Sequence, residues 1–252
     1  MDIAVITGAS SGIGECFVID LNKEFKYDEI WLISRRREKL ELISKRINTK
    51  TRIIDLDLSD ETNLQVYKDI LEEIKPNIKI LVNASGFGKF CEFEKGKLED
   101  YFNMIDLNDK ALVAMTYISL PYMKEFSQIY QMGSLSSFQP VPYIGIYGAS
   151  KAFVLSFSRA LNVELKKRKI KVMAVCPGWV KTEFFNRAVV DDTITYYNKY
   201  FTPEEVVKRA IKDMKKGKDI SICGASVRIQ VFFTKLLPHK LIMKIWCKQQ
   251  KK

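Results

Sequence analysis

The chain has 252 residues, 47% of them hydrophobic, which is enough to bury a sizeable core as one domain. A single histidine and five dispersed cysteines without a CxxC pair argue against a metal site. No run of 18 apolar residues occurs and the first apolar strand begins at residue 2, so we expect no membrane span, no signal peptide and a cytoplasmic location. The formal net charge is +11, but residues 227–252 hold seven of the cations and no acid, so the rest of the chain carries only +4. The positive charge belongs to a basic tail more than to the whole protein, and we expect no nucleic-acid partner.

Apolar runs rich in β-forming residues recur along the chain and alternate with amphipathic helical stretches. They lie at residues 2–7, 29–34, 51–56, 78–83, 128–134, 170–176 and 219–223. Strands that alternate with helices predict an α/β fold with a doubly wound parallel sheet of about seven strands, helices on both faces, and a single domain. In such a sheet the ligand crevice lies beyond the carboxyl ends of the strands. Six residues fall there: Gly8, Ser34, Asp57, Asn83, Ser134 and Pro177.

The first strand leads directly into a glycine loop, which is followed by a helical stretch from Glu15 to Phe25. Gly8, Gly12 and Gly14 let the backbone turn tightly and approach a diphosphate, while the N–H groups at the start of the helix face the anion. The spacing TGxxxGxG differs from the general dinucleotide pattern GxGxxG. Its place between a strand and a helix nevertheless predicts dinucleotide binding rather than an incidental turn.

The same loop also matches GxSxG, the nucleophile elbow of α/β-hydrolases, with Ser10 as the nucleophile. Position argues against that alternative, because a hydrolase elbow follows earlier strands and an oxyanion loop. Only residues 1–7 precede this turn. A catalytic triad would also depend on His239, which lies in a basic C-terminal segment.

Tyr147 and Lys151 stand four residues apart in a helical stretch, the spacing that brings an ammonium beside a phenol. A tyrosine titrates near pH ~10, and bringing its pKa to about 7 takes roughly 4 kcal/mol. A cation about 4 Å away at an effective dielectric of ~20 supplies about 4 kcal/mol. The pair therefore predicts a proton donor and acceptor that works near neutral pH, although Tyr-xxx-Lys also occurs on ordinary helices.

Seven motifs follow one another between Thr7 and Thr182: TGASSGIG at 7–14, DLSD at 57–60, NASG at 83–86, Asn108, Ser134 thirteen residues before Tyr147, YGASK at 147–151, and PGWVKT at 177–182. In content and order they resemble the short-chain dehydrogenase/reductase family. The resemblance implies a Rossmann-like fold, a nicotinamide cofactor and an oxidoreductase that acts on CH–OH or carbonyl groups.

The resemblance also implies a role for each of four catalytic residues. Tyr147 would donate the proton to the carbonyl, and Lys151 would lower the tyrosine pKa and bond the nicotinamide ribose. Ser134 would hold and polarise the substrate oxygen, so that two donors meet its developing charge. Asn108 would anchor a water that links Lys151 to solvent.

The chain departs from the family pattern at two places. NASG stands where NNAG is usual, with Ser85 in the third position, and MGSLSS stands where a pattern like ISSxAG is common. Ser136 and Ser137 therefore compete with Ser134, and the thirteen-residue spacing selects Ser134.

The family pattern also predicts the cofactor contacts, which lie in the glycine loop, at the strand ends and in the two later motifs. They are Gly8, Ser10, Ser11, Gly12, Ile13, Gly14, Ser34, Arg35, Arg36, Asp57, Leu58, Asn83, Ala84, Ser85, Gly86, Tyr147, Lys151, Pro177, Gly178, Val180 and Thr182. After the second strand no acid is present to bond a free ribose 2′-hydroxyl. Guanidinium groups suit a 2′-phosphate, so the sequence predicts NADP(H), with Arg35 as the first contact and Arg36 as the second. Arg37 is expected only to start a solvated helix.

Residues 183–201 carry six aromatic side chains where the family has its substrate lid: Phe184, Phe185, Tyr196, Tyr197, Tyr200 and Phe201. An aromatic lid predicts an apolar ketone or secondary alcohol, steroid- or lipid-like, although core packing would account for about half of these side chains. Four other aromatic residues are candidates for the same pocket: Phe87, Phe90, Phe93 and Tyr143.

The tail at residues 227–252 combines apolar and basic residues in two short helical patterns broken at Pro238. We expect a basic amphipathic extension that packs on or next to a dinucleotide-binding and catalytic domain at residues 1–226. Three roles stay open for the tail: peripheral contact with an anionic membrane, closure over the pocket, or joining of subunits in a homo-oligomer, a dimer or tetramer.

The sequence as a whole predicts an NADP(H)-dependent reductase or dehydrogenase of an apolar carbonyl or hydroxyl compound. A 3-oxoacyl (carrier protein) reductase is the alternative enzyme, because a positive surface suits an acidic carrier. A catalytically idle NADP(H)-binding sensor or interaction protein is the alternative from another class.

Overall fold

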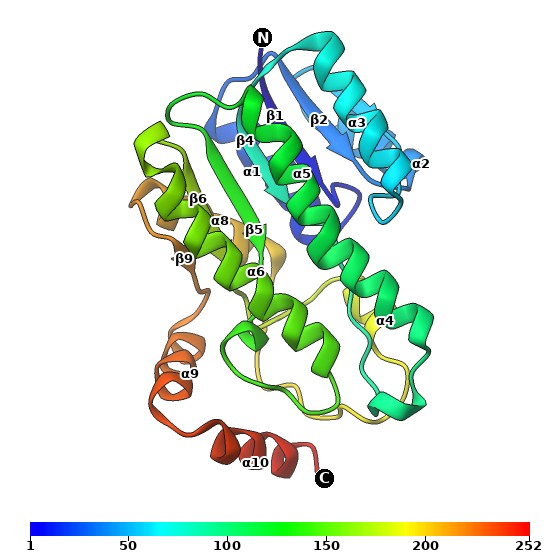
Figure 1. Cartoon of the computed structure of the whole chain (residues 1–252), viewed down its shortest axis with the longest axis vertical. Coiled ribbons are helices and arrows are strands. Elements are labelled where there is room, and N and C mark those ends of the chain that lie inside the picture. Colours follow the sequence, from blue (N-terminus) through cyan, green and yellow to red (C-terminus); the bar gives the residue numbers. More distant parts are fainter.

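A seven-stranded parallel sheet forms the centre of the computed structural model, which describes residues 1–252 (Figure 1). The strand order is β3-β2-β1-β4-β5-β6-β9. The strands are β1 (Asp2–Thr7), β2 (Glu29–Ile33), β3 (Thr51–Ile54), β4 (Asn77–Asn83), β5 (Gln128–Met132), β6 (Lys171–Val175) and β9 (Ile220–Ser221). A separate pair, β7 (Trp179–Val180) and β8 (Tyr200–Phe201), lies outside the sheet. The order reverses between β1 and β4, where a doubly wound sheet opens its ligand crevice.

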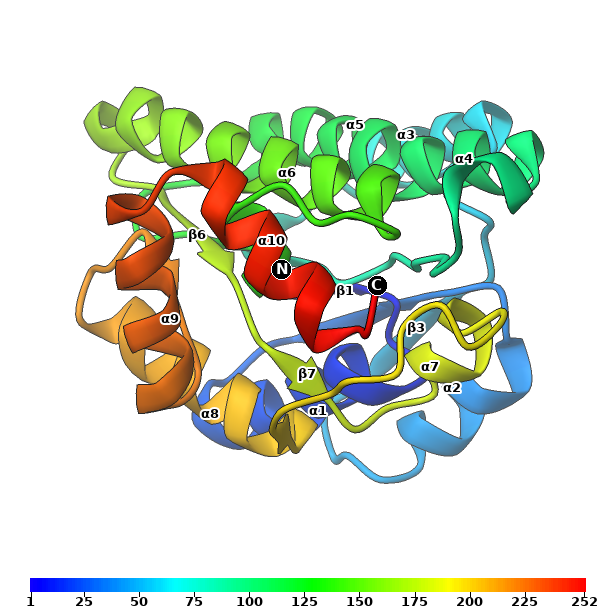
Figure 2. The same cartoon turned by 90° about the horizontal axis from the view of Figure 1, so that it is seen from below.

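Ten α-helices surround the sheet and continue beyond its carboxyl edge. They are α1 (Gly12–Glu24), α2 (Arg37–Ser44), α3 (Glu61–Ile74), α4 (Leu98–Ile105), α5 (Ala111–Ser119), α6 (Gly145–Glu164), α7 (Phe184–Ala188), α8 (Pro203–Lys215), α9 (Ala225–Leu236) and α10 (His239–Gln249). Figure 2 shows α3, α5 and α6 on one side of the sheet and α1, α2 and α8 on the other. The predicted doubly wound fold is confirmed.

The sheet is buried on both faces, which explains the nearly continuous apolar strands in the sequence. Along β1, Ala4 and Ile6 belong to the cluster formed with α1, α2 and α8. Ile3 and Val5 belong to the cluster formed with α3, α5 and α6. This alternation follows from the two-residue period of a strand, and it divides the core into two layers.

Several strands end one or two residues earlier than predicted, because the chain leaves the sheet to form site turns. The clearest case is β5, which ends at Met132 rather than at residue 134. There Ser134 caps a short 3₁₀ turn, and its hydroxyl accepts a hydrogen bond from the Ser136 amide. The polar residues after the strands are thus part of the crevice and not of the sheet.

The C-terminal helices α9 and α10 lie beyond the carboxyl ends of the strands, at the lower end of the molecule in Figure 1. Pro238 separates them, as predicted, because proline lacks the N–H that a continuous helix needs. None of the helices combines the length and apolar character needed to cross a membrane.

Candidate functional site

The glycine loop after β1 forms the floor of a groove at the carboxyl edge of the sheet. Gly8 has φ +63°, in the region that favours glycine, and a Cβ on Gly14 would overlap the main-chain oxygen of Gly8. Helix α1 begins at Gly12, and its N-cap residue Ser11 makes no side-chain capping bond. The positive end of the helix is therefore left for an anion at the groove.

The groove has a volume of about 480 Å³, and fifteen of the predicted cofactor contacts line it. They are Gly8, Ser10, Ser11, Gly12, Ile13, Gly14, Ser34, Arg35, Arg36, Asp57, Leu58, Ala84, Ser85, Gly86 and Thr182. Glu183 and Arg187 also line it, and the sequence analysis did not select either of them. The Arg187 guanidinium stacks on the Phe87 ring, 3.5 Å from its centroid.

The three arginines that follow β2 have different partners. The Arg35 Nη1 donates to Asp57 Oδ2 at 3.1 Å. Arg37 pairs with Glu41 and Asp55, as expected at the start of a solvated helix. Arg36 instead lies across the glycine loop, where it bonds Ser10, Ser11 and Glu183.

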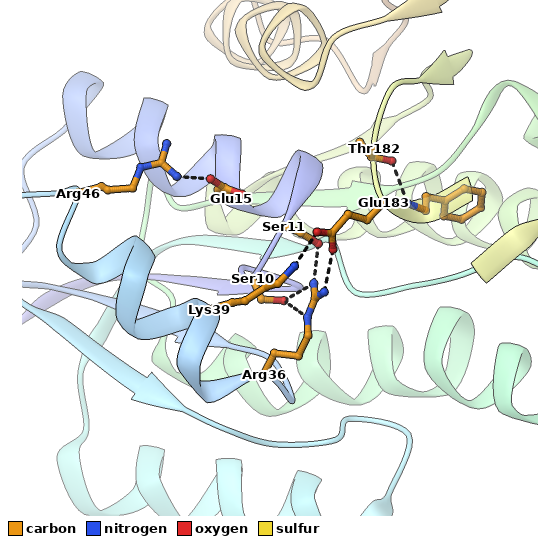
Figure 3. A network of polar contacts seen from close by, with 9 residues as sticks. Ser10, Ser11, Glu15, Arg36, Lys39, Arg46, Thr182 and Glu183 are labelled. Atoms are coloured by element: carbon orange, nitrogen blue, oxygen red, sulfur yellow. Dashed lines mark hydrogen bonds and ion pairs between the residues drawn. The ribbon is translucent and has the colours of Figure 1, made fainter. Parts of the chain in front are cut away.

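Arg36 Nη2 donates to the hydroxyls of Ser10 at 2.8 Å and Ser11 at 2.7 Å, and its Nε also donates to Ser10 (Figure 3). Its Nη1 donates to Glu183 Oε2 at 2.8 Å. The other carboxylate oxygen of Glu183 accepts a hydrogen bond from Lys39 Nζ at 2.6 Å. Lys39 and Glu183 are residues that sequence reasoning missed, because they are 144 positions apart and only the fold brings them together.

Asn83 is the one predicted cofactor contact that lines neither cavity of the site. Its side chain is buried, and its Nδ2 donates to Thr116 Oγ1 at 3.1 Å and to Gln131 Oε1 at 2.8 Å. The amide nitrogen thus joins β4 to β5 and α5, and a direct contact of Asn83 with the cofactor stays a prediction. The Thr7 hydroxyl accepts hydrogen bonds from the amides of Ala84 and Ser85 and holds the NASG turn beside the glycine loop.

A second cavity, of about 440 Å³, adjoins the groove and shares five lining residues with it: Ile13, Ala84, Gly86, Thr182 and Phe184. It is lined by the other predicted cofactor contacts apart from Asn83, namely Tyr147, Lys151, Pro177, Gly178 and Val180, and by the catalytic candidate Ser134. Three of the four catalytic candidates, Ser134, Tyr147 and Lys151, thus line an apolar cavity that adjoins the groove of the glycine loop.

Helix α6 presents Tyr147 and Lys151 to this cavity, and the turn after β5 presents Ser134. Lys151 Nζ lies 5.7 Å from the centroid of the Tyr147 ring and donates to the main-chain oxygen of Met132 at 2.9 Å. Ser137 is placed differently, since its hydroxyl donates to the main-chain oxygen of Lys151 at 2.7 Å. The geometry therefore separates Ser134, at the cavity, from Ser137, which fastens α6 to the turn.

Burial dominates the electrostatics of the pair. It raises the pKa of Tyr147 to about 12, with the neighbouring Ser134 side chain opposing the shift. It lowers the pKa of Lys151 to about 8, with the carboxylate of Asp109 opposing the shift. The ammonium of Lys151 bonds Met132, and both groups lose their hydration, so the acidic phenol expected from Lys151 stays a prediction.

Asn108 lies in a π-helical segment, Asp106–Lys110, between α4 and α5, and it is fully buried. Its Oδ1 accepts from the Phe87 amide at 3.0 Å, and its Nδ2 donates to the Phe87 oxygen at 2.9 Å and to Ser150 Oγ at 3.1 Å. A Cβ on Gly86 would lie 2.8 Å from Asn108 Oδ1 and 3.4 Å from Lys151 Nζ. Asn108 therefore joins the NASG segment to α6 close to Lys151, while its role as a water anchor stays a prediction.

Aromatic rings form one wall of the apolar cavity. The Tyr147 ring centroid lies 5.6 Å from that of Phe184 and 6.1 Å from that of Phe90. Phe185 and Tyr196 also line the cavity, whereas Tyr197 and Tyr200 pack behind Phe185.

The other aromatic candidates lie elsewhere. Phe93 is 68% exposed and stacks on Tyr101, and Phe201 is buried in the main core. Phe87 lines the cofactor groove, and Tyr143 lines neither cavity. Sequence could not separate these side chains, because their direction depends on loop backbone.

The tail lies across the mouth of the apolar cavity. The Trp246 Nε1 donates to the main-chain oxygen of Pro142 at 3.0 Å, and Gln250 Oε1 accepts from the amides of Thr195 and Tyr196, each at 3.0 Å. The tail residues that line the cavity are Gln230, Phe233, Thr234, Leu237, Ile242, Ile245, Trp246 and Gln249. Of the three open roles, these contacts favour closure over the pocket, and peripheral membrane contact gains no support from them.

Comparison with known proteins identifies the family. A family model described as short chain dehydrogenase matches residues 2–192. The NADP-dependent 3-hydroxy acid dehydrogenase YdfG of Shigella flexneri is 34% identical over 215 residues, which cover 81% of this chain and 85% of that protein. Sulfoacetaldehyde reductase 2 of Chromohalobacter salexigens is 36% identical over 194 residues, covering 73% of this chain and 74% of that protein.

A solved structure described as a short-chain dehydrogenase from Sphingobium yanoikuyae in complex with NADPH has a TM-score of 0.80 to this chain. It is 27% identical in sequence, and the match covers 94% of this chain and 93% of that one. The chain therefore belongs to the short-chain dehydrogenase family, whose members are oxidoreductases of alcohol and carbonyl groups that use a nicotinamide cofactor.

Proposed function

We propose that the protein is an NADP(H)-dependent oxidoreductase of apolar ketones or secondary alcohols of steroid-like or lipid-like size. One observation carries the proposal. Ser134, Tyr147 and Lys151 converge where the glycine-loop groove adjoins an apolar cavity, and Lys151 is the only charged residue among the 31 that line that cavity. A substrate oxygen can meet two hydroxyl donors there, while an apolar body fills the remainder.

The groove fits NADP(H) on its own geometry. The glycine turn leaves room for a diphosphate, the open start of α1 faces it, and Arg36 offers a forked cation beside Ser10 and Ser11. We propose Arg36 as the first contact for a 2′-phosphate, because its guanidinium contacts Ser10 and Ser11 of the glycine loop. Arg35, which is bonded to Asp57 and contacts neither serine, is proposed as the second. When bound, the cofactor would supply or accept the hydride.

The chain's own residues would handle the proton and the oxygen. Ser134 would hold the carbonyl oxygen, and Tyr147 would transfer a proton to it as negative charge develops. Lys151, at 5.7 Å from the phenol ring, would stabilise the phenolate that remains. Burial raises the phenol pKa to about 12, so Tyr147 holds its proton at neutral pH until negative charge develops on the carbonyl oxygen.

The residues that line the cavity favour an apolar substrate over a small acid. The named relatives, by contrast, act on a 3-hydroxy acid and on sulfoacetaldehyde. A carboxylate or sulfonate needs a cationic or multiply bonded partner, and the one cation of the wall is already bonded to Met132. Eighteen of the 31 lining residues are hydrophobic, which suits a substrate that buries apolar area.

The test is NADPH oxidation with matched carbonyl compounds. A panel would include bulky steroid and alkyl ketones, a 3-oxo acid and sulfoacetaldehyde. We expect the bulky ketones to give the highest kcat/KM and to lose activity in Tyr147→Phe. A higher kcat/KM for the charged compounds would contradict the proposed substrate class, and no turnover at all would favour a sensor.

A 3-oxoacyl reductase is the second candidate, because Lys240, Lys244 and Lys248 are exposed on α10, whose other face lines the cavity. An acidic carrier could dock on these cations while its acyl chain enters the pocket. An acyl-thioester arm in the same panel separates the two enzymes, since carrier-bound substrates would then exceed free ketones in kcat/KM.

We also propose that residues 1–226 form the catalytic domain and that the extension at 227–252 packs on it as the lid of the pocket. The proposed homo-oligomer, a dimer or tetramer, is supported by exposed apolar side chains on α4, α5 and α6, including Phe102, Tyr117 and Phe153. Sedimentation velocity of the purified protein tests it. A cytoplasmic location is proposed from the five unpaired cysteines.

A further inference from the structure

The carboxylate of Glu183 lies in the cofactor groove, beside the arginine that we propose as the first contact for a 2′-phosphate. It lies between two cations, accepting from Arg36 Nη1 at 2.8 Å and from Lys39 Nζ at 2.6 Å (Figure 3). Both side chains of the Arg36–Glu183 pair are close to half exposed, so a ligand can reach them. The two cations hold the pKa of Glu183 at about 2, and the group is charged at any ordinary pH.

The Arg36 guanidinium has five N–H groups, and four of them are already bonded within the protein. Its Nε and Nη2 are bonded to Ser10 and Ser11, and only Nη1 points toward Glu183. A phosphate that approached this guanidinium would meet a carboxylate already on the available nitrogen. It would also meet electrostatic repulsion from that carboxylate, since like charges in one site disfavour each other.

Glu183 also belongs to the chain that forms the wall of the substrate cavity. It precedes α7, whose residue Phe184 lines both the groove and the cavity and packs 5.6 Å from the Tyr147 ring. The Phe184 amide donates to the Thr182 hydroxyl at 3.3 Å, and Thr182 lines both cavities as well. The ion pair thus ties this segment to α2 on the far side of the groove.

We propose that Glu183 is an internal competitor for the cofactor 2′-phosphate, holding Arg36 and Lys39 when no 2′-phosphate is bound and giving them up when one binds. Glu183 and Lys39 are then determinants of cofactor affinity and specificity that act together with Arg36. The inference rests on the proposed use of NADP(H). It predicts that the protein binds the 2′-phosphate less tightly than its cations alone would allow.

The experiment measures NADPH and NADH affinity by titration calorimetry in the wild type and in Glu183→Gln. Glutamine keeps the shape of the side chain and removes its charge. Because an exposed ion pair contributes up to about 1 kcal/mol, we expect NADPH affinity to rise roughly two- to fivefold while NADH affinity stays constant. The fragment 2′-AMP should gain in the same way, and 5′-AMP should not.

A matched control is Glu41→Gln, which removes one negative charge from α2, where Glu41 pairs with Arg37 outside the groove. It should leave both affinities unchanged. In an Arg36→Met background, Glu183→Gln should lose most of its effect on NADPH, because the cation for which it competes is gone. High salt should shrink the gain, as screening weakens exposed charges.

Every outcome of these titrations either supports or overturns the inference about Glu183. Weaker NADPH binding in Glu183→Gln would overturn the inference and show instead that Glu183 holds Arg36 in place. An unchanged affinity, or an equal gain for NADH or in Glu41→Gln, would also overturn it while leaving the cofactor proposal intact. A wild type that binds NADPH no more tightly than NADH would overturn the proposed cofactor preference, and this inference with it.

Discussion

The indole of Trp246 donates a hydrogen bond to the main-chain oxygen of Pro142 at 3.0 Å, although 104 residues separate them in the sequence. Pro142 stands five residues before Tyr147, in the loop that enters α6. Trp246 also packs with the aromatic cluster around Phe90 and Tyr147. The last helix of the chain is therefore attached to the segment that presents the proposed proton donor.

We expect Trp246→Phe to raise KM for a bulky ketone about fivefold, because the variant keeps an aromatic ring but loses a hydrogen bond of about 1 kcal/mol. NADPH affinity should stay constant, since Trp246 does not line the groove. Steady-state kinetics with a bulky ketone measure the effect. Phe232→Ala is the control, because Phe232 is 59% exposed on α9 and does not line the cavity. Equal effects of both substitutions would contradict a role for Trp246 in the pocket.

Replacement of Tyr147 by phenylalanine should lower kcat at least ~10²-fold, because the loss of a positioned general acid typically costs that much. NADPH binding should survive, since the ring and its packing against Phe184 are kept. Single-turnover NADPH oxidation and a separate binding titration check the two statements. Tyr143→Phe makes the same chemical change outside both cavities and should retain activity. Near-normal turnover in Tyr147→Phe would mean that another group donates the proton.

Arg36→Ala should weaken NADPH by roughly 10- to 150-fold, the effect of losing a charge-assisted contact of ~1.5–3 kcal/mol, and should change NADH much less. Arg35→Ala should have a smaller effect on NADPH, because Arg35 is bonded to Asp57 and, unlike Arg36, does not contact Ser10 or Ser11 of the glycine loop. Dissociation constants for both cofactors in both variants test this order. If Arg35→Ala cost more than Arg36→Ala, the ranking taken from the sequence would stand instead.

The buried ammonium of Lys151 should make stability depend on pH. Burial lowers its pKa from 10.5 to about 8, so between these values the unfolded chain holds a proton that the folded protein has released. The free energy of unfolding therefore rises with pH in that window, and the full cost of burying the charge is present below pH 8. Relative to Lys151→Met, the wild type should gain up to about 1.4 kcal/mol per pH unit.

Urea unfolding of the wild type and Lys151→Met at pH 7, 8, 9 and 10 measures this difference. Titrating groups distant from Lys151 are common to both proteins and cancel in the comparison. A difference that stays constant from pH 7 to 10 would show that the folded protein keeps the lysine protonated throughout.

The sequence by itself determined the fold and the place of the crevice. Apolar runs such as residues 2–7 and 78–83, separated by helical stretches, require a parallel sheet that is buried on both faces, and the carboxyl ends of its strands then meet at one edge. Gly8, Ser134 and the Tyr147/Lys151 pair could be placed at that edge because each follows or faces a strand end in the chain order.

Only the tertiary structure decided the direction in which each of two adjacent side chains extends. Arg35 and Arg36 are adjacent in sequence, yet the turn after β2 directs one toward Asp57 and the other across the glycine loop. Spacing along the chain cannot tell them apart, since the direction of a side chain in a turn depends on backbone angles that packing selects.

Spacing along the chain likewise cannot predict which distant residues contact the site, or how burial changes the pKa values of its groups. Glu183 reaches Arg36 across 147 residues, and α10 returns to cover the cavity, through contacts that no local pattern encodes. The spacing of Tyr147 and Lys151 predicted a cation beside a phenol, but the pKa of each group follows from its burial. Burial is the sum of packing from β5, α7 and α10, so it exists only once the chain has folded.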